Sequence, residues 1–124
     1  MTTSFPLAGS AVESFQDDSL VLGGLIDFDN GTLESGQNLT RGTVIGRVTA
    51  TGELKLSVQT ASDGSEQPVG ALAHDVDASA AASGCQFVRG GWLNKTLLTW
   101  DASWTTALQK SAFDGTPIRL VTPE

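Results

Sequence analysis

The residues with the clearest chemical potential lie around the one histidine of the chain. His74 is followed by Asp75 and Asp77, and Cys85 is the one cysteine. A cysteine paired with a histidine can act as a nucleophile, and paired carboxylates can bind a cation or transfer protons. His74 and Asp75 are adjacent, so on a strand they would point to opposite faces. Nothing local brings Cys85 to His74. We therefore expect a solvated loop here rather than a catalytic site.

The other candidate chemical groups also have simpler explanations. Asp27 and Asp29 are spaced to share one strand face, but turn residues follow them, which favours a solvated carboxylate pair. Lys55 lies in a hairpin, a setting similar to the lysine of carrier domains, but three residues beyond Gly52 rather than in the turn. One cysteine and one histidine cannot build a common zinc site within one subunit. The paired glycines at 23–24 and 90–91 lack the residues of a phosphate-binding loop. We expect no cofactor and no metal.

Composition narrows the class of protein. The chain has 124 residues, 40% hydrophobic residues and a mean hydropathy of −0.01, which is typical of one soluble domain. A net charge of −7 disfavours binding to nucleic acid or anionic membranes. No apolar run is long enough to span a bilayer. The first residues lack the basic and apolar regions of a signal peptide, so we expect synthesis and assembly in a cytoplasm.

Residues 42–73 organise the expected fold, because two alternating apolar runs meet at residues 50–52 and a third follows Asp63-Gly64. A three-residue loop would pair Val48 with Leu54, Gly46 with Leu56 and Val44 with Val58. That register puts the apolar side chains on one buried face, and Gly52 can take the left-handed conformation that such loops need. Arg47 would then oppose Lys55.

The remaining pattern predicts a mainly β fold with one short helix near the C-terminus. We expect strands at residues 19–28, 69–73 and 86–89, an extended segment at 92–98 and a last strand at 118–121, with Pro68 opening the strand at 69. Gly23-Gly24 predicts a bulge or a close backbone approach. Turns or loops are expected at residues 29–31, 33–41, 61–67 and 75–84, and Gly90-Gly91 should interrupt a strand.

The only good helical pattern begins near Trp104. Trp104, Ala107, Leu108 and Ala112 recur at helical spacing. Ser103 or Asp101 could cap the helix, Asp114-Gly115 should end it, and Pro117 should prevent its restart.

Residues 1–18 are expected to form an arm outside one β-rich domain of residues 19–124. Their apolar side chains are too sparse for a core element but too many for a solubilising tail. The residues alone favour a disordered terminus, with a segment that folds on a partner as the alternative.

The C-terminal half resembles a known family. Residues 87–92 (FVRGGW), 98–100 (LTW) and 108–121 (LQKSAFDGTPIRLV), with Asp63-Gly64 and residues 68–73 (PVGALA) upstream, are similar to the phage lambda head decoration protein family. The resemblance covers about residues 40–121 and rests on the order and spacing of these motifs. The N-terminal region does not match residue by residue, and residues 27–37 look like extra material.

The resemblance implies a non-enzymatic virion protein with a β-clip-like core. It implies a homotrimer that binds the coat protein on the outside of the expanded head, at three-fold and quasi-three-fold positions, and stabilises the head against internal DNA pressure. It also changes the interpretation of the arm, which would add a strand to the coat lattice. The capsid-binding residues expected in the arm are Ser4, Phe5, Pro6, Leu7, Val12 and Phe15.

Three alternatives stay open at this stage. Trp92, Trp100 and Trp104 could lie in the trimer interface or in the core. A small trimeric β-rich enzyme, with a site at subunit boundaries, would use His74, Asp75, Asp77 and Cys85. A phage tail or baseplate accessory protein would share the β-rich trimer but not the lattice partner.

Overall fold

The computed structural model describes residues 20–122, so the predicted arm residues lie outside the described part of the chain. The fold is mainly β, with 48% strand and 9% helical residues and one short helix near the C-terminus, which confirms the predicted fold class. The elements in order are β1 (Val21–Leu33), β2 (Gln37–Leu39), β3 (Val44–Arg47), β4 (Leu54–Leu56), β5 (Pro68–Leu72), β6 (Val76–Ala78), β7 (Ser83–Asn94), the 3-10 helix η2 (Lys95–Leu97), α1 (Thr106–Ser111) and β8 (Ile118–Val121).

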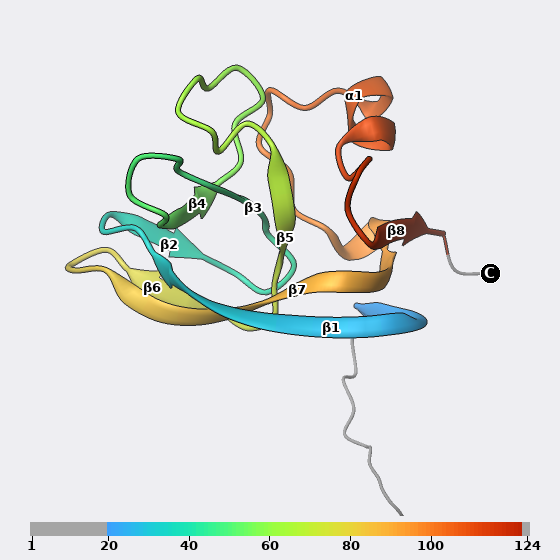
Figure 1. Cartoon of the computed structure of the whole chain (residues 1–124), viewed down its shortest axis with the longest axis horizontal. Helices are drawn as coiled ribbons and strands as arrows, with labels where there is room; N and C mark the ends of the chain where they lie inside the picture. Colours follow the sequence, from blue (N-terminus) through green and yellow to red (C-terminus); the bar gives the residue numbers. More distant parts are fainter. Residues whose placement is uncertain (1–19, 123–124) are drawn as a thin grey trace, which may run out of the picture.

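The strands form a small ring with an extension. The order of the main sheet is β1-β4-β3-β5-β7-β8. Because β1 also pairs with β7, the strands β1, β4, β3, β5 and β7 form a closed ring, and β8 extends it. β2 and β6 form a separate two-stranded ribbon. The long strands β1 and β7 run side by side beneath the shorter strands, and α1 lies above the end where β7 meets β8 (Figure 1).

The central strands are buried on both faces. Val44, Ala71 and Val88 belong to one apolar cluster with Leu93, Trp104, Phe113 and Ile118. Each of these three residues has a sequence neighbour in a second cluster. These neighbours are Ile45, Leu72 and Phe87, and they pack with Leu33, Leu54 and Cys85. Since successive side chains of a strand point to opposite faces, one sheet separates two cores.

The predicted hairpin exists, but its predicted register is wrong by one residue. Ile45 pairs with Leu56, Gly46 with Lys55 and Arg47 with Leu54. The Val48 amide donates to the Glu53 carbonyl at 2.8 Å, so the loop contains four residues, 49–52. Gly52 is left-handed at φ 74°, as predicted. The prediction assumed one buried face, but Ile45 on the other face is also fully buried, and the observed register keeps Arg47 away from Lys55.

The turn predicted at Asp29-Asn30-Gly31 is wrong, because β1 continues to Leu33 along β7. Gly31 pairs with Cys85, and a Cβ at position 31 would lie 2.6 Å from Leu54 Cδ1. This glycine therefore permits a close approach of β4 and does not mark a turn.

The loops predicted at residues 33–41 and 75–84 contain β2 and β6. These short strands pair Gln37 with Ala78, Asn38 with Asp77 and Leu39 with Val76. Each strand has only three residues, so the local pattern is too short to reveal a ladder between distant segments. Three other predictions are confirmed: the loop at 61–67, the opening of β5 by Pro68 and the strand at 118–121.

The segment around Gly90-Gly91 also differs from the prediction. β7 runs without interruption through both glycines. Gly91, at φ 118°, lies opposite the bulge of β1. The extended segment predicted to reach Leu98 ends at Asn94, whose side chain accepts from the Thr96 amide and caps η2.

The predicted helix is present but shorter. Thr105, rather than Ser103 or Asp101, caps α1 by accepting from the Leu108 amide. Asp101 instead accepts from the Ser103 amide in the turn before the helix. Trp104 and Ala112, which flank α1, are buried, whereas no residue within α1 is buried.

Candidate functional site

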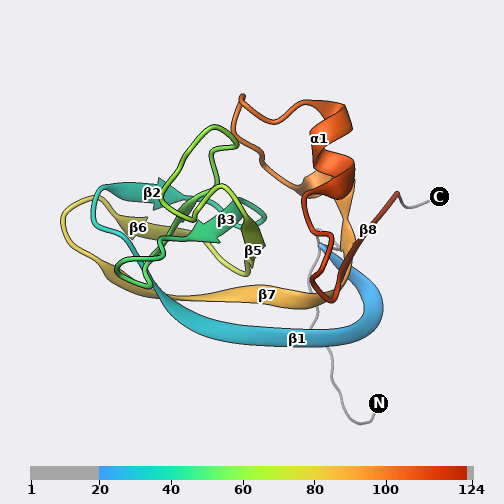
Figure 2. The ribbon, with the colours of Figure 1, turned by 45° about the horizontal axis from the view of Figure 1, so that its top comes forward.

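Four large apolar side chains are exposed at one end of the β1–β7 ladder. Leu25 is 91% exposed, Ile26 49%, Phe28 48% and Trp92 45%. We call these four residues the β1–β7 patch. This is the end where β1 bends back on itself next to β8, which is plain in Figure 2. Exposed apolar side chains of this size on a small domain make this surface a candidate for contact with another protein.

Glycines build the bend that carries the patch. The ladder shifts register between Gly23, paired with Trp92, and Asp27, paired with Gly90, so residues 24–26 bulge out of β1. Gly24 is left-handed at φ 81°, and a Cβ there would lie 2.6 Å from Trp92 Cδ1. The predicted bulge or close approach at Gly23-Gly24 is therefore confirmed, and both features occur together.

The outer edge of β1 adds to this surface. Within the described residues, β1 pairs with β7 along one edge but with β4 only at Leu33, opposite Leu54. An unpaired strand edge offers backbone groups to another chain. The patch therefore lies beside an open edge as well as exposing apolar area.

Arg89 holds the carboxylates nearest the patch. Its Nε lies 3.0 Å from Asp27 Oδ2, and its Nη1 lies 3.4 Å from Asp29 Oδ2. The two aspartates share one strand face, as their spacing predicted, but they bind an arginine. Because all three side chains are about half exposed, such pairs contribute about 0–1 kcal/mol.

The three tryptophans have different environments. Trp104 is 9% exposed, and its Nε1 donates to the Ser57 carbonyl at 2.9 Å. Trp100 is half-buried, with its ring centroid 5.3 Å from that of Trp104 and 5.9 Å from that of Phe113. Trp92 lies on the surface with the Arg119 guanidinium 5.8 Å from its ring centroid. The trimer interface predicted for these residues stays a prediction, with Trp92 the most exposed of the three.

The structure does not assemble His74, Asp75, Asp77 and Cys85 into one site. His74 Nδ1 lies 3.0 Å from the Asp75 carbonyl oxygen, and His74 Nε2 accepts from the Gln86 amide at 3.2 Å. Because the neutral imidazole then has Nδ1–H as its donor, both ring nitrogens have backbone partners. Cys85 is buried in the second core cluster, and this burial raises the pKa of its thiol. A buried thiol of this kind is a poor nucleophile.

The aspartates of that region have structural partners. Asp75 Oδ1 accepts from the Arg41 amide at 2.8 Å. Asp77 Oδ1 accepts from the hydroxyl and amide of Ser79, and these bonds lower the pKa of Asp77. Lys55 Nζ lies 3.8 Å from Glu34 and 3.6 Å from Asp63, so this lysine is part of a surface ion pair.

Among residues 20–122, no group of three or more His, Cys, Asp or Glu side chains could hold a metal ion. None of the described helices is long and apolar enough to cross a membrane.

Comparison with known families identifies the kind of protein. Residues 18–120 match the family model described as bacteriophage lambda head decoration protein D. The chain belongs to this head decoration family. No curated protein matched the chain.

Membership gives this head decoration protein a role on the phage capsid. The family is a structural, non-enzymatic kind of protein. The match extends N-terminally well beyond the motifs at 63–121 and includes all of β1. Sequence reasoning assigned β1 partly to a strand but did not foresee that Leu25, Ile26 and Phe28 would be exposed. The two glycine pairs, which lie on the two strands at the bulge, were the available signal.

Proposed function

We propose that this chain forms homotrimers that bind the outer surface of the expanded phage head at three-fold and quasi-three-fold positions. The bound trimers hold neighbouring coat subunits together and stabilise the head against internal DNA pressure, without catalysis. The observation that carries the proposal is the family match across residues 18–120, which covers nearly the whole described fold. We further propose that the protein is made in the cytoplasm of the bacterial host.

The β1–β7 patch is the surface that we assign to contact between subunits. Leu25, Ile26, Phe28 and Trp92 are exposed in the single subunit. Covering such side chains gains about 25 cal/mol for each Å² of apolar surface removed from water. The open edge of β1 next to the patch provides backbone groups for a neighbouring subunit.

Residues 1–18 are the capsid-binding arm of this proposal, and residues 19–124 are the β-rich domain. Extended peptides bind by strand addition, in which backbone hydrogen bonds give affinity and alternate side chains fill pockets. Ser4, Phe5, Pro6, Leu7, Val12 and Phe15 are the arm residues assigned to the coat protein.

The net charge supports a position away from the packaged DNA. Fourteen acidic and seven basic residues give the chain a charge of −7, which repels a polyphosphate. An outer position on the head avoids this repulsion.

The physical mechanism is linkage rather than chemistry. A protein that binds the assembled lattice and not the separated coat subunits stabilises the lattice by mass action. Three modest contacts on one trimer combine through their high effective concentration. Saturating amounts of the protein should therefore raise the temperature at which expanded heads break down.

Electron microscopy of expanded heads mixed with the purified protein tests the proposal. We expect density at the three-fold and quasi-three-fold positions, and light scattering of the free protein should give about 39 kDa, which is three times 12.9 kDa. A chain lacking residues 1–18 should remain trimeric but bind heads more weakly. Bare heads at excess protein would contradict the proposal, and tight binding by the truncated chain would contradict the role of the arm.

The two alternative functions predict different results. A tail or baseplate accessory protein would form trimers but leave expanded heads bare. A trimeric enzyme would lose its function when His74 and Cys85 are replaced, and the partners of these residues described above do not favour this alternative.

A further inference from the structure

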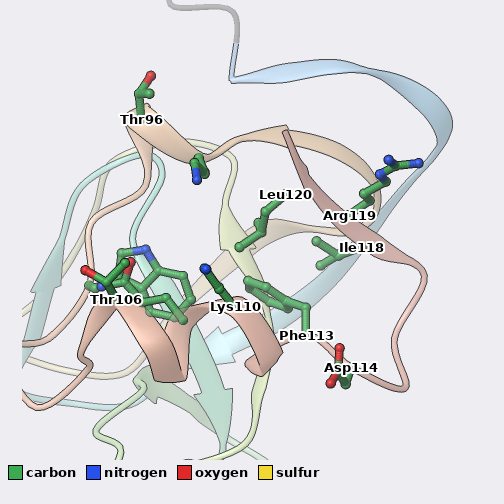
Figure 3. A pocket seen from close by; sticks show the side chains of 11 residues that line it. Thr96, Thr106, Lys110, Phe113, Asp114, Ile118, Arg119 and Leu120 are labelled. Atoms are coloured by element: carbon green, nitrogen blue, oxygen red, sulfur yellow. The ribbon is translucent and has the colours of Figure 1, made fainter. Parts of the chain in front are cut away.

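A pocket of about 480 Å³ lies between the helical segments and β8. Its floor is apolar, with Phe113 and Ile118 buried and Trp100 and Leu120 half-buried. Figure 3 shows Phe113, Ile118 and Leu120 directed towards the same space, with Lys110 beside Phe113. The floor could hold one aromatic side chain.

The rim of this pocket has the opposite charge to the protein as a whole. Lys95, Lys110 and Arg119 line the pocket, and Asp114 is the one acidic residue among the lining residues. Three of the seven basic residues of the chain are thus gathered here. Within the described chain, neither Lys95 nor Lys110 has a carboxylate at ion-pairing distance. An aromatic group between acidic residues fits this combination.

One such segment lies just before Leu20 in the sequence. Residues 13–18 (ESFQDD) have Phe15 between Glu13 and the pair Asp17-Asp18, and residues 1–18 contain no lysine or arginine. Leu20 is 1% exposed, and its carbonyl accepts from the Asn94 amide at 2.8 Å. Asn94 caps η2, in which Lys95 and Thr96 line the pocket. The hydrogen bond between Leu20 and Asn94 thus fixes the position at which the chain enters the domain, directly beside the rim of the pocket.

The length of the segment agrees with this position. Phe15 is five residues before Leu20, and an extended chain of five residues spans at most about 17 Å. We propose that the pocket binds residues 13–18 of the same chain, with Phe15 on the apolar floor and the carboxylates of Glu13, Asp17 and Asp18 facing the lysines. In the free protein this binding anchors the base of the arm and leaves residues 1–12 free for the coat protein, and Phe15 leaves the pocket when the whole arm binds the coat lattice.

Fluorine NMR of the full chain, without capsids, tests this proposal. All phenylalanines are replaced by 4-fluorophenylalanine, and the signals of Phe15 and Phe5 are assigned with Phe15→Leu and Phe5→Leu. At low salt we expect the Phe15 signal to be shifted from the solvent-exposed position and to respond little to exchange of H₂O for D₂O. Phe5, in the same arm, should give a solvent-exposed signal and is the internal control.

Charge variants show whether the pocket causes the shift. The double variant Lys95→Gln with Lys110→Gln should move the Phe15 signal to the position of Phe5, and so should high salt, because salt screens exposed charges. Lys55→Gln removes a lysine outside the pocket and should leave the Phe15 signal shifted. None of the three lysines is buried, so none of these variants should unfold the chain.

Three results would overturn the proposal. The first is coincident Phe15 and Phe5 signals in the parent chain at low salt. The second is a Phe15 shift that survives in the double lysine variant. The third is a shift that disappears on dilution to the monomer, which would assign the pocket to the arm of a neighbouring copy. Because no capsid is present, none of these results depends on whether the protein decorates heads.

Discussion

The indole ring of Trp92 packs against the backbone of Gly24, across the bulge at which β1 bends. A Cβ at position 24 would lie 2.6 Å from Trp92 Cδ1 and 2.8 Å from its Nε1. The contact joins the bend of β1 to the exposed ring that Arg119 covers on β8. Gly24 thereby fixes the shape of the β1–β7 patch, on which the proposed subunit contact depends.

Gly24→Ala should displace the Trp92 ring and destabilise the subunit. The left-handed backbone costs about 1 kcal/mol for a residue with a Cβ, and the steric overlap adds about 1–3 kcal/mol. Gly52→Ala is the matched control, because Gly52 is also left-handed, at φ 74°, and has open space at the Cβ position. Urea unfolding measures the loss of free energy, and the NMR signal of the Trp92 indole reports the ring. Equal losses in the two variants would contradict the packing argument.

Trp104→Phe should cost more stability than Trp100→Phe. The first change leaves the buried Ser57 carbonyl without the Nε1–H of Trp104, and an unsatisfied buried group costs about 1–3 kcal/mol. The second change removes a similar ring area from a half-buried residue whose indole has no hydrogen bond within residues 20–122. Urea midpoints from far-UV circular dichroism compare the two. Identical midpoints would show that the hydrogen bond to Ser57 adds nothing.

The double variant Leu25→Asn with Ile26→Asn should weaken the trimer and leave the fold intact. Both side chains are exposed in the single subunit, so the change in subunit stability should stay within about 0.5 kcal/mol. Light scattering should show the mass falling from about 39 kDa towards 12.9 kDa. Leu108→Asn, which replaces another exposed leucine on α1, is the control and should keep the mass of the trimer. An unchanged mass in the double variant would remove the patch from the interface.

Stability should decrease when the pH falls below about 4, partly because of Asp63 and Asp77. Hydrogen bonds from the Ser65 hydroxyl to Asp63 and from the Ser79 hydroxyl to Asp77 are the largest causes of the lowered pKa values of these carboxyls. With a pKa lower in the folded than in the unfolded state, the folded protein binds fewer protons, so stability rises with pH. The contribution is present above the unfolded pKa and is lost as the pH falls through the folded pKa.

Urea midpoints between pH 2 and pH 6 measure this dependence. Asp77→Asn removes one titrating group while keeping an oxygen that can accept from Ser79. The difference between the parent chain and this variant should therefore be largest at pH 6 and shrink towards pH 2. A constant difference across the range would contradict the assignment.

His74→Ala and Cys85→Ala should each leave binding to expanded heads unchanged. His74→Ala removes the acceptor of the Gln86 amide, and Cys85→Ala removes a buried sulfur, so each should cost about 1 kcal/mol of subunit stability. Co-sedimentation with heads measures binding, and thermal unfolding measures stability. Loss of binding in both variants, at a temperature where both are folded, would favour a functional role for this pair.

Local sequence patterns determined the fold class and many of the elements. The alternation in residues 42–73 marked β3, β4 and β5, and the pattern of Ile118 to Val121 marked β8. Gly52 took the left-handed conformation that its turn required, and Gly23-Gly24 marked the bulge. These features are local, because they depend on the periodicity of side chains along one strand and on the conformational freedom of single glycines.

The tertiary structure decided which faces are buried, and therefore the register. Ile45 and Arg47 lie on the same face of β3, yet Ile45 packs in the second core and Arg47 is exposed. An alternating pattern indicates one buried face, and only the closure of the sheet through the β1–β7 pairing shows that the other face is buried too. The pairing of Gly31 with Cys85 has the same origin, because Leu54 approaches position 31 from a distant strand.

The surfaces proposed for function also depend on distant parts of the chain. Phe28 and Trp92 have the residue types of a core, yet both are exposed in the folded subunit. Lys95, Lys110 and Arg119 are far apart in the sequence and meet because η2, α1 and β8 surround one pocket. The sequence by itself determined the kind of protein, through motifs whose order identifies its family. Which side chains remain exposed to a partner was decided by packing between distant segments.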